Sequence, residues 1–99
     1  MSPYLEVVFP DRTEMVPLDG QRVTVGRGSS NDVTVDDATA SRRHAVFQRL
    51  AAGWSVTDAG STNGTLVNGS YIDQPQPLFS GDEIVVGETR LVYHSGDIR

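Results

Sequence analysis

Two residue types are missing from this sequence, and each absence excludes a class of chemistry. There is no cysteine, so disulfides, thiolate metal ligands, iron–sulfur clusters and cysteine nucleophiles are excluded within the chain. There is no lysine either, because all eight basic residues are arginine. Schiff-base chemistry and the lysine-containing phosphate loop of nucleotide hydrolases therefore cannot occur. Only two histidines are present, too few for a three-histidine zinc site.

Long apolar segments are also lacking. The longest apolar runs, such as Val7–Phe9 and Ile84–Val86, are three residues long, whereas a membrane span needs about 18 apolar residues. The first residues, Met1–Glu6, lack the basic and then apolar layout of a signal peptide. We therefore expect a soluble, cytoplasmic protein without membrane association.

Length and apolar content predict one small folded domain. The chain has 99 residues, of which 37% are hydrophobic, enough for one modest core and too many for a disordered segment. We expect residues 1–99 to form a single domain. The net charge of −5 argues against general nucleic-acid binding, which needs a broad basic surface. Five of the eight arginines nevertheless lie from Arg22 to Arg49, a pattern that indicates a local site for a small anionic group.

Short alternating segments separated by turn residues predict an all-β fold. The chain has 10 glycines and 5 prolines, and apolar residues alternate with polar ones in Tyr4–Phe9, Arg22–Val25, Trp54–Thr57, Glu83–Val86 and Arg90–Tyr93. Many short strands with turns between them are typical of an antiparallel sandwich or barrel. Asn63-Gly64 and Asn68-Gly69 predict two-residue hairpin turns, because both residue types tolerate positive φ.

Local rules leave the segment Ser41–Gly53 open. Ser41 suits the N-cap of a helix that would carry His44 and Phe47 on one face and end before the glycine. The same stretch also alternates as a strand does, with Ala45 and Phe47 facing inward. The pattern alone does not choose between helix and strand.

Three polar clusters adjoin the predicted strands, and we expect them to meet at one end of the sandwich, at residues 26–32, 41–44 and 58–65. Arg27 and Arg42 supply planar, permanently charged guanidinium groups that match phosphate oxygens. Ser41 and Thr62 supply hydroxyl donors, and the amide of Asn63 can bond a peptide main chain. These groups favour the holding of an anion over the breaking of a bond.

Two other chemistries are weaker readings of the same residues. The aspartates at positions 32, 36 and 37 lack the glycine and the glutamate of a calcium-binding loop. A hydrolase triad of Ser41, His44 and Asp58 has neither a nucleophile elbow nor an evident oxyanion hole. We therefore expect no catalytic residue, no metal and no cofactor, and we do not expect an enzyme.

Together the three clusters resemble the forkhead-associated (FHA) domain. They read G-R-x-x-x-N-D-V from Gly26, S-R-R-H-A from Ser41 and D-x-G-S-T-N-G-T-x-V-N-G from Asp58. The resemblance covers about residues 4–94, with no departure at the core positions of the motif. It implies an antiparallel β-sandwich of about eleven short strands, with ligand loops at one end, that binds phosphothreonine peptides. It also implies that Ala45–Leu50 is a strand.

The resemblance implies a role for each residue of a phosphopeptide site. Arg27 resembles the arginine that clamps the phosphate, and Ser41 resembles the serine that binds it. Arg42 matches a position whose side chain often reaches the phosphate or the peptide. Thr62 resembles the residue that helps to enclose the phosphothreonine. Asn63 resembles the asparagine that hydrogen-bonds the peptide main chain just after it.

The remaining motif residues are expected to shape the loops or to be solvated. Gly26, His44 and Gly64 match loop-structuring positions, and His44 is expected to be a hydrogen-bonded structural residue. Arg43 is interpreted as a solvated charge, and His94 as a surface residue. Thr39, Ala40 and the 63–67 segment are expected to shape the pocket for peptide residues beyond the phosphothreonine.

The function implied is that of a phosphothreonine-dependent adaptor downstream of a Ser/Thr protein kinase in a bacterial cytoplasm. Its partner would be a phosphothreonine-containing protein or peptide, such as the kinase or a kinase substrate. We expect the isolated domain to be monomeric and to belong to a longer protein. The alternative is a protein-interaction domain of the same fold that binds independently of phosphate, through a sheet face or another loop.

Overall fold

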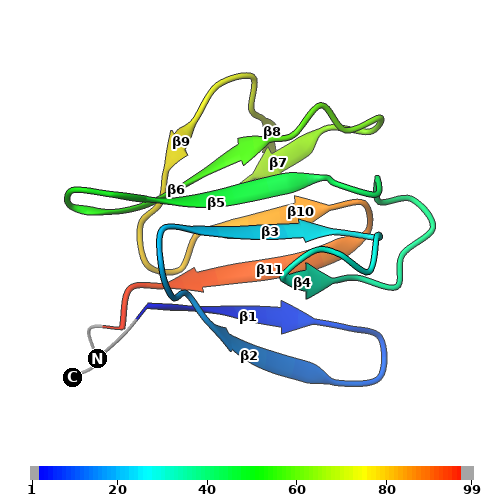
Figure 1. Ribbon diagram of the computed structural model, residues 1–99, viewed down its shortest axis with the longest axis horizontal. Helices are drawn as coiled ribbons and strands as arrows, with labels where there is room; N and C mark the ends of the chain where they lie inside the picture. Colours follow the sequence, from blue (N-terminus) through cyan, green and yellow to red (C-terminus); the bar gives the residue numbers. More distant parts are fainter. Residues whose placement is uncertain (1–2, 97–99) are drawn as a thin grey trace.

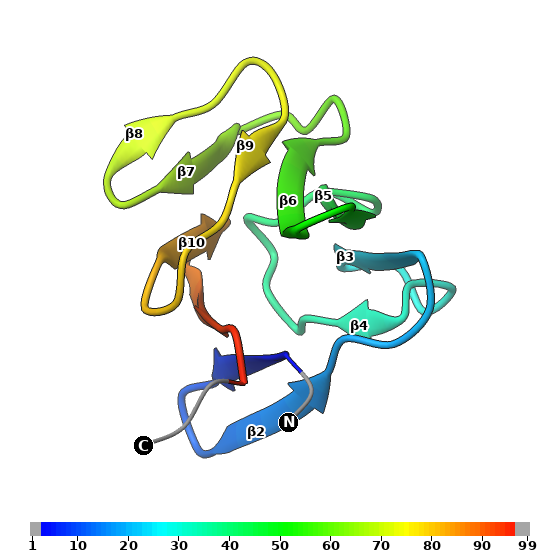
Figure 2. The same ribbon diagram turned by 90° about the vertical axis from the view of Figure 1, so that its left-hand side faces the viewer.

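The computed structural model describes residues 3–96, which form two packed β-sheets (Figures 1 and 2). The eleven strands are β1 (Tyr4–Val8), β2 (Thr13–Pro17), β3 (Arg22–Gly26), β4 (Val33–Thr34), β5 (Ala45–Leu50), β6 (Gly53–Asp58), β7 (Thr65–Val67), β8 (Ser70–Tyr71), β9 (Gln76–Pro77), β10 (Glu83–Val86) and β11 (Thr89–His94). One sheet has the order β2-β1-β11-β10-β7-β8 and the other β4-β3-β5-β6-β9. Neighbouring strands pair antiparallel except β3 and β4, which pair parallel. The expected eleven-stranded β-sandwich is confirmed.

The core lies between the two sheets, where alternation directs every second side chain. Leu5 and Val7 of β1 are fully buried, as are Ala45 and Phe47 of β5 in the opposite sheet. Burial of a side chain such as Phe47 contributes about 1.5–3 kcal/mol. Alternation in strands such as β1 and β5 therefore supplies apolar side chains to the core from both sheets.

The segment that local rules left open is a strand, and the helical alternative is wrong. Strand β5 pairs with β3 on one side and with β6 on the other. Its Ala45 and Phe47 are buried while Gln48 and Arg49 are exposed. A place at the centre of a sheet satisfies the main chain on both edges, which outweighs the local helix signals.

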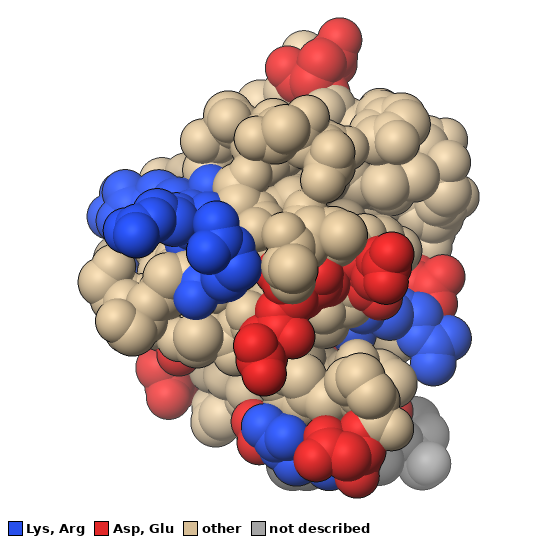
Figure 3. Space-filling model, turned by 90° about the vertical axis from the view of Figure 1, so that its right-hand side faces the viewer, with Lys and Arg blue, Asp and Glu red and all other residues tan. Residues whose placement is uncertain are grey.

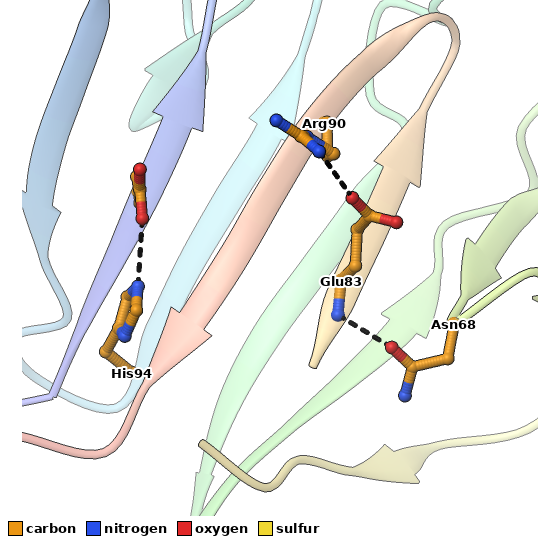
Figure 4. Close-up of polar contacts among 5 residues, drawn as sticks. Asn68, Glu83, Arg90 and His94 are labelled. Atoms are coloured by element: carbon orange, nitrogen blue, oxygen red, sulfur yellow. Dashed lines mark hydrogen bonds and ion pairs between the residues drawn. The ribbon is translucent and has the colours of Figure 1, made fainter. Parts of the chain in front are cut away.

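One predicted hairpin turn is present. Asn68 has φ of 51° and Gly69 has φ of 86°, and the flanking residues Val67 and Ser70 pair directly. The Asn68 side chain adds a long-range contact, because its Oδ1 accepts a hydrogen bond from the main-chain N–H of Glu83 at 2.9 Å (Figure 4). The turn thereby fastens the β7–β8 hairpin to strand β10.

The hairpin predicted at Asn63-Gly64 is wrong. Strand β6 before it belongs to the five-stranded sheet and strand β7 after it belongs to the six-stranded sheet, so the connection crosses the sandwich. Gly64 has φ of 82°, but Asn63 does not have positive φ, because Asn68 is the only non-glycine residue with positive φ in the described part of the chain. The physical reason is that Asp58 captures main-chain N–H groups of residues 60 and 61, which opens a wider loop.

His94, expected at the surface, is partly exposed and has two side-chain partners. Its imidazole stacks on the Tyr4 ring at a centroid distance of 4.6 Å. Its Nε2 lies 3.0 Å from a carboxylate oxygen of Glu6, and Figure 4 shows this contact beside β11. These contacts link β1 to β11 at the end of the sandwich away from the ligand loops.

The loops between β3 and β4, β4 and β5, and β10 and β11 gather at one end of the sandwich, on the right in Figure 1. The buried His44 ties the β4–β5 loop (residues 35–44) to the β6–β7 loop (residues 59–64). Its Nδ1 accepts a hydrogen bond from the main-chain N–H of Ser41 at 3.1 Å, and its Nε2 lies 2.8 Å from the Gly64 carbonyl. A main-chain N–H only donates and a carbonyl only accepts, so the ring carries its proton on Nε2.

Asp37 ties the β4–β5 loop to the β10–β11 turn. Its carboxylate accepts hydrogen bonds from Thr39 N–H at 2.9 Å, Glu88 N–H at 2.8 Å and Thr89 Oγ1 at 2.8 Å. A Cβ on Gly87 would lie 2.8 Å from Asp37 Oδ2, so glycine is needed at this turn. Burial opposes ionisation of Asp37, but the hydrogen bonds from Thr39, Glu88 and Thr89 outweigh it and lower its pKa from 3.8 to about 2.

We predict that His44→Ala destabilises the domain. The substitution leaves a cavity and removes the partners of the Ser41 N–H and the Gly64 carbonyl. The free energy of unfolding should fall by about 2–4 kcal/mol, measured by urea denaturation. Gln74 is exposed and its side chain has no hydrogen-bond partner among residues 3–96, so it provides the control: Gln74→Ala should change stability by less than about 0.5 kcal/mol. Equal stabilities of the two variants would contradict the structural role of His44.

A second prediction concerns acid stability. The pKa of Asp37 is lower in the folded than in the unfolded protein. Its contribution to the free energy of unfolding is therefore complete above pH 4 and is lost as pH falls toward about 2. Asp37→Asn should lower the free energy of unfolding at pH 6 by about 1 kcal/mol, a small value because the carboxylate is partly exposed. The difference between the two proteins should shrink in urea titrations repeated toward pH 2. A constant difference across this range would show that the charge of Asp37 is unimportant.

Candidate functional site

All five side chains expected to contact a ligand line one pocket at the loop end. The pocket has a volume of about 370 Å³ and is lined by Arg27, Ala38, Thr39, Ala40, Ser41, Arg42, Thr62 and Asn63. They come from the β3–β4 loop (residues 27–32), the β4–β5 loop and the β6–β7 loop. Residues 35 positions apart in the sequence therefore face the same small volume.

Two hydrogen bonds hold Arg27 in place. Its main-chain N–H donates to the Ser41 carbonyl at 2.9 Å, and its side-chain Nε donates to the Ala40 carbonyl at 3.0 Å. These bonds fix the base of the side chain and leave the two terminal nitrogens for a ligand. Such an oriented guanidinium loses little conformational freedom when it binds two oxygens of one anion.

Asn31 and the glycines bring the β3–β4 and β4–β5 loops together. Asn31 Nδ2 donates to the carbonyls of Gly28 at 2.7 Å and of Arg42 at 2.6 Å. A Cβ on Gly26 would collide with the Arg42 carbonyl, so a glycine is required for this close approach. Sequence reasoning assigned no role to Asn31, although its place in the first motif was a signal.

Two further hydrogen bonds orient Ser41 and Asn63 in the pocket. The Thr62 N–H donates to Ser41 Oγ at 2.9 Å, which leaves the Ser41 hydroxyl hydrogen available to an anion. Asn63 Nδ2 donates to the Thr39 carbonyl at 2.8 Å. The side-chain oxygen of Asn63, Oδ1, is left as an acceptor for a peptide N–H. Ser41 and Asn63 therefore offer a hydroxyl donor for a phosphate and an amide acceptor for a peptide main chain.

Asp58 shapes the β6–β7 loop from its base. It accepts hydrogen bonds from Gly60 N–H at 3.0 Å, Ser61 N–H at 3.0 Å and Thr65 Oγ1 at 2.7 Å. Burial opposes ionisation of this carboxyl, but the bonds from Ser61, Thr65 and Gly60 prevail and lower its pKa. The Tyr71 ring closes the other side, because a Cβ on Gly64 would lie 2.8 Å from it. Sequence reasoning missed Tyr71, which carries no motif signal.

The electrostatics of the pocket favour an anion. Arg27 and Arg42 are exposed, and within residues 3–96 the arginines that form ion pairs are Arg12 and Arg90. Figure 3 shows a group of arginine side chains gathered at this end of the molecule. Unpaired guanidinium groups on a protein of net charge −5 make a local positive field that a phosphate would satisfy.

The triad considered from the sequence is not assembled. Both ring nitrogens of His44 bond main-chain groups, and the Asp58 carboxylate is taken by its own loop. Among the described residues, no group of three or more His, Asp or Glu side chains is placed to hold a metal ion. No helix in residues 3–96 is long and apolar enough to cross a membrane.

Comparison with known proteins agrees with this geometry. The family model described as FHA domain matches residues 23–87. The oxoglutarate dehydrogenase inhibitor of Corynebacterium diphtheriae is 44% identical over 79 residues, which are 80% of this chain and 54% of the relative. The chain thus spans about half the length of that relative.

Solved structures share the whole fold. An FHA domain studied for phosphothreonine-dependent interactions superposes with a TM-score of 0.89 at 26% identity, covering 99% of this chain and 100% of the other. Mycobacterium tuberculosis EmbR in complex with a low-affinity phosphopeptide gives a TM-score of 0.86 at 26% identity, covering 99% of this chain and 25% of EmbR. With the sequence motifs, the sandwich and the family match in agreement, this chain belongs to the FHA domain family.

Proposed function

We propose that this domain binds phosphothreonine peptides through Arg27, Ser41, Arg42, Thr62 and Asn63. The observation that carries the proposal is a pocket that two arginines and a serine hydroxyl line together. Among the described residues, neither arginine forms an ion pair and no carboxylate lines the pocket. A phosphate brings about −1.5 to −2 charges and three acceptor oxygens. The two match in charge and in hydrogen-bonding capacity.

The energetics predict a moderate affinity. Each charge-assisted hydrogen bond to a phosphate contributes about 1.5–3 kcal/mol. Three or four such bonds, less the ordering of the peptide, leave about 8 kcal/mol, which corresponds to a micromolar Kd. Loss of the phosphate would remove these bonds, so binding should depend strongly on phosphorylation.

The relatives support a role in signalling. The structural neighbours include an FHA domain from a study of phosphothreonine-dependent interactions and EmbR with a bound phosphopeptide. We infer that the domain serves as a cytoplasmic, monomeric adaptor within a longer protein. Its partner would be a Ser/Thr protein kinase or a substrate that the kinase has phosphorylated.

Dependence on phosphothreonine is the first prediction from this function. Calorimetric titration with a degenerate phosphothreonine peptide pool should give a micromolar Kd. The matching phosphoserine pool should bind more weakly, because it lacks the threonine methyl group, and the unphosphorylated pool should not bind. Equal binding of all pools would favour the alternative, a domain of this fold that recognises its partner independently of phosphate.

The role of Arg27 yields a matched pair of variants. Arg27→Ala should lose about 2–4 kcal/mol of phosphopeptide binding free energy, because it removes the charged fork and leaves the phosphate partly unpaired. Stability should change little, since the side chain is exposed. Arg49→Ala removes an exposed arginine that does not line the pocket and should retain binding. If both variants bind as wild type does, Arg27 has no part in recognition.

A further inference from the structure

A second and larger hollow lies at the loop end, next to the pocket that Arg27 and Ser41 line, which we call the phosphate pocket. Its volume is about 620 Å³, and we call it the flanking groove; it is lined by Val8, Phe9, Pro10, Asp36, Asp37, Ala38, Thr39, Glu88, Thr89 and Arg90. Ala38 and Thr39 line both hollows. The two hollows therefore lie side by side, so the groove is within reach of a peptide held at Arg27.

The flanking groove is acidic, in contrast to the phosphate pocket. Asp36, Asp37 and Glu88 line it, and none of them forms an ion pair within the described residues. Arg90 also lines it, but its guanidinium is engaged by Glu83 at 3.0 Å, as Figure 4 shows. Figure 3 shows a band of acidic side chains beside the arginine group on this face. A ligand that spans both hollows would therefore meet positive and then negative potential.

One wall of the groove is apolar and suits an aliphatic stem. Val8, Phe9 and Pro10 form this wall. A guanidinium group already lies on one of these residues, since the Arg12 carbon Cζ is 4.4 Å from the centroid of the Phe9 ring. The charge of Arg12 is compensated by Asp11 and Glu14, so it does not neutralise the carboxylates across the groove.

The acidic groups differ in what they have left to offer. The Asp37 carboxylate is taken up by the loop contacts described above, so it contributes charge without free acceptor geometry. Asp36 and Glu88 are exposed, and among residues 3–96 neither carboxylate has a hydrogen-bond partner. These two groups can turn toward a cation.

We propose that the flanking groove receives an arginine or lysine side chain of the same phosphopeptide, a few residues to one side of the phosphothreonine. The aliphatic stem lies on Val8 and Pro10, and the charged head meets Asp36 and Glu88. The inference rests on the proposed phosphothreonine binding and adds the charge pattern of the ligand: a phosphate followed or preceded by a basic residue. The shared lining residues of the two hollows and their opposite charges favour this occupant over a separate partner.

The test uses phosphothreonine peptides that differ only in one flanking residue. Alanine, arginine and glutamate are placed in turn at each of about five positions on either side, the reach of an extended chain across this face at about 3.3 Å per residue. Fluorescence anisotropy then gives Kd for each peptide. At one or two neighbouring positions on one side, the peptide with arginine should bind about fivefold more tightly than the peptide with alanine. The peptide with glutamate at the same position should bind more weakly than the peptide with alanine.

Variants locate the preference in the groove. In a protein carrying Asp36→Asn and Glu88→Gln, the advantage of arginine over alanine should vanish while the alanine peptide keeps its wild-type Kd within about twofold. The control carries Asp19→Asn and Asp73→Asn, which remove the same charge from exposed positions outside the groove, and it should retain the preference. A preference lost equally in both proteins would reflect net charge and would overturn the groove.

The outcomes separate this inference from the function on which it rests. If phosphothreonine peptides bind but arginine gives no advantage at any position, the groove proposal is wrong and phosphopeptide binding stands. If no phosphorylated peptide binds, both proposals fail together. If arginine is favoured on one side and only the groove variant abolishes the advantage, both are supported.

Discussion

The site depends on the two hydrogen bonds of one buried imidazole. His44 is fully buried, and it accepts from the Ser41 N–H and donates to the Gly64 carbonyl. Ser41 belongs to a loop of the five-stranded sheet and Gly64 to the connection that crosses to the six-stranded sheet. A polar ring buried with both nitrogens satisfied costs little, whereas the loss of either partner would expose the full desolvation penalty. His44 therefore sets, from the interior of the protein, the distance between the β4–β5 loop and the β6–β7 loop, which both line the phosphate pocket.

Charge separation is the second constraint, and it follows from how the carboxylates are used. The Asp37 carboxylate is engaged by donors of its own loop and of the β10–β11 turn, and the Asp58 carboxylate by donors of the β6–β7 loop. Both stabilise loop geometry, and within residues 3–96 neither forms an ion pair with an arginine. Arg27 and Arg42 are left with positive charge to offer. An acidic protein can in this way present a basic pocket, and the acidic flanking groove lies directly beside it.

Success and failure of the sequence predictions follow the range of the interactions involved. The Asn68-Gly69 turn was predictable because positive φ and the pairing of adjacent strands are local properties. The Asn63-Gly64 hairpin was wrong because the Asp58 side chain competes for the main chain of that loop. For β5, local pattern was undecided, and resemblance to a family supplied the strand. The partners of His94 were not foreseen, because Glu6 and Tyr4 on β1 lie 88 and 90 positions away in the sequence.

The sequence by itself determined the fold class and the chemistry of the candidate ligand. Alternation with period two required sheets with one buried face, and the clustered arginine, serine, threonine and asparagine residues indicated an anion site. Only the tertiary structure decided how the loops are spaced and what surrounds the pocket. Asp37 reaches Glu88 and Thr89 across more than 50 positions, and the groove combines residues of β1, the β4–β5 loop and the β10–β11 turn. Such contacts depend on the packing of one sheet against the other, which no local pattern encodes.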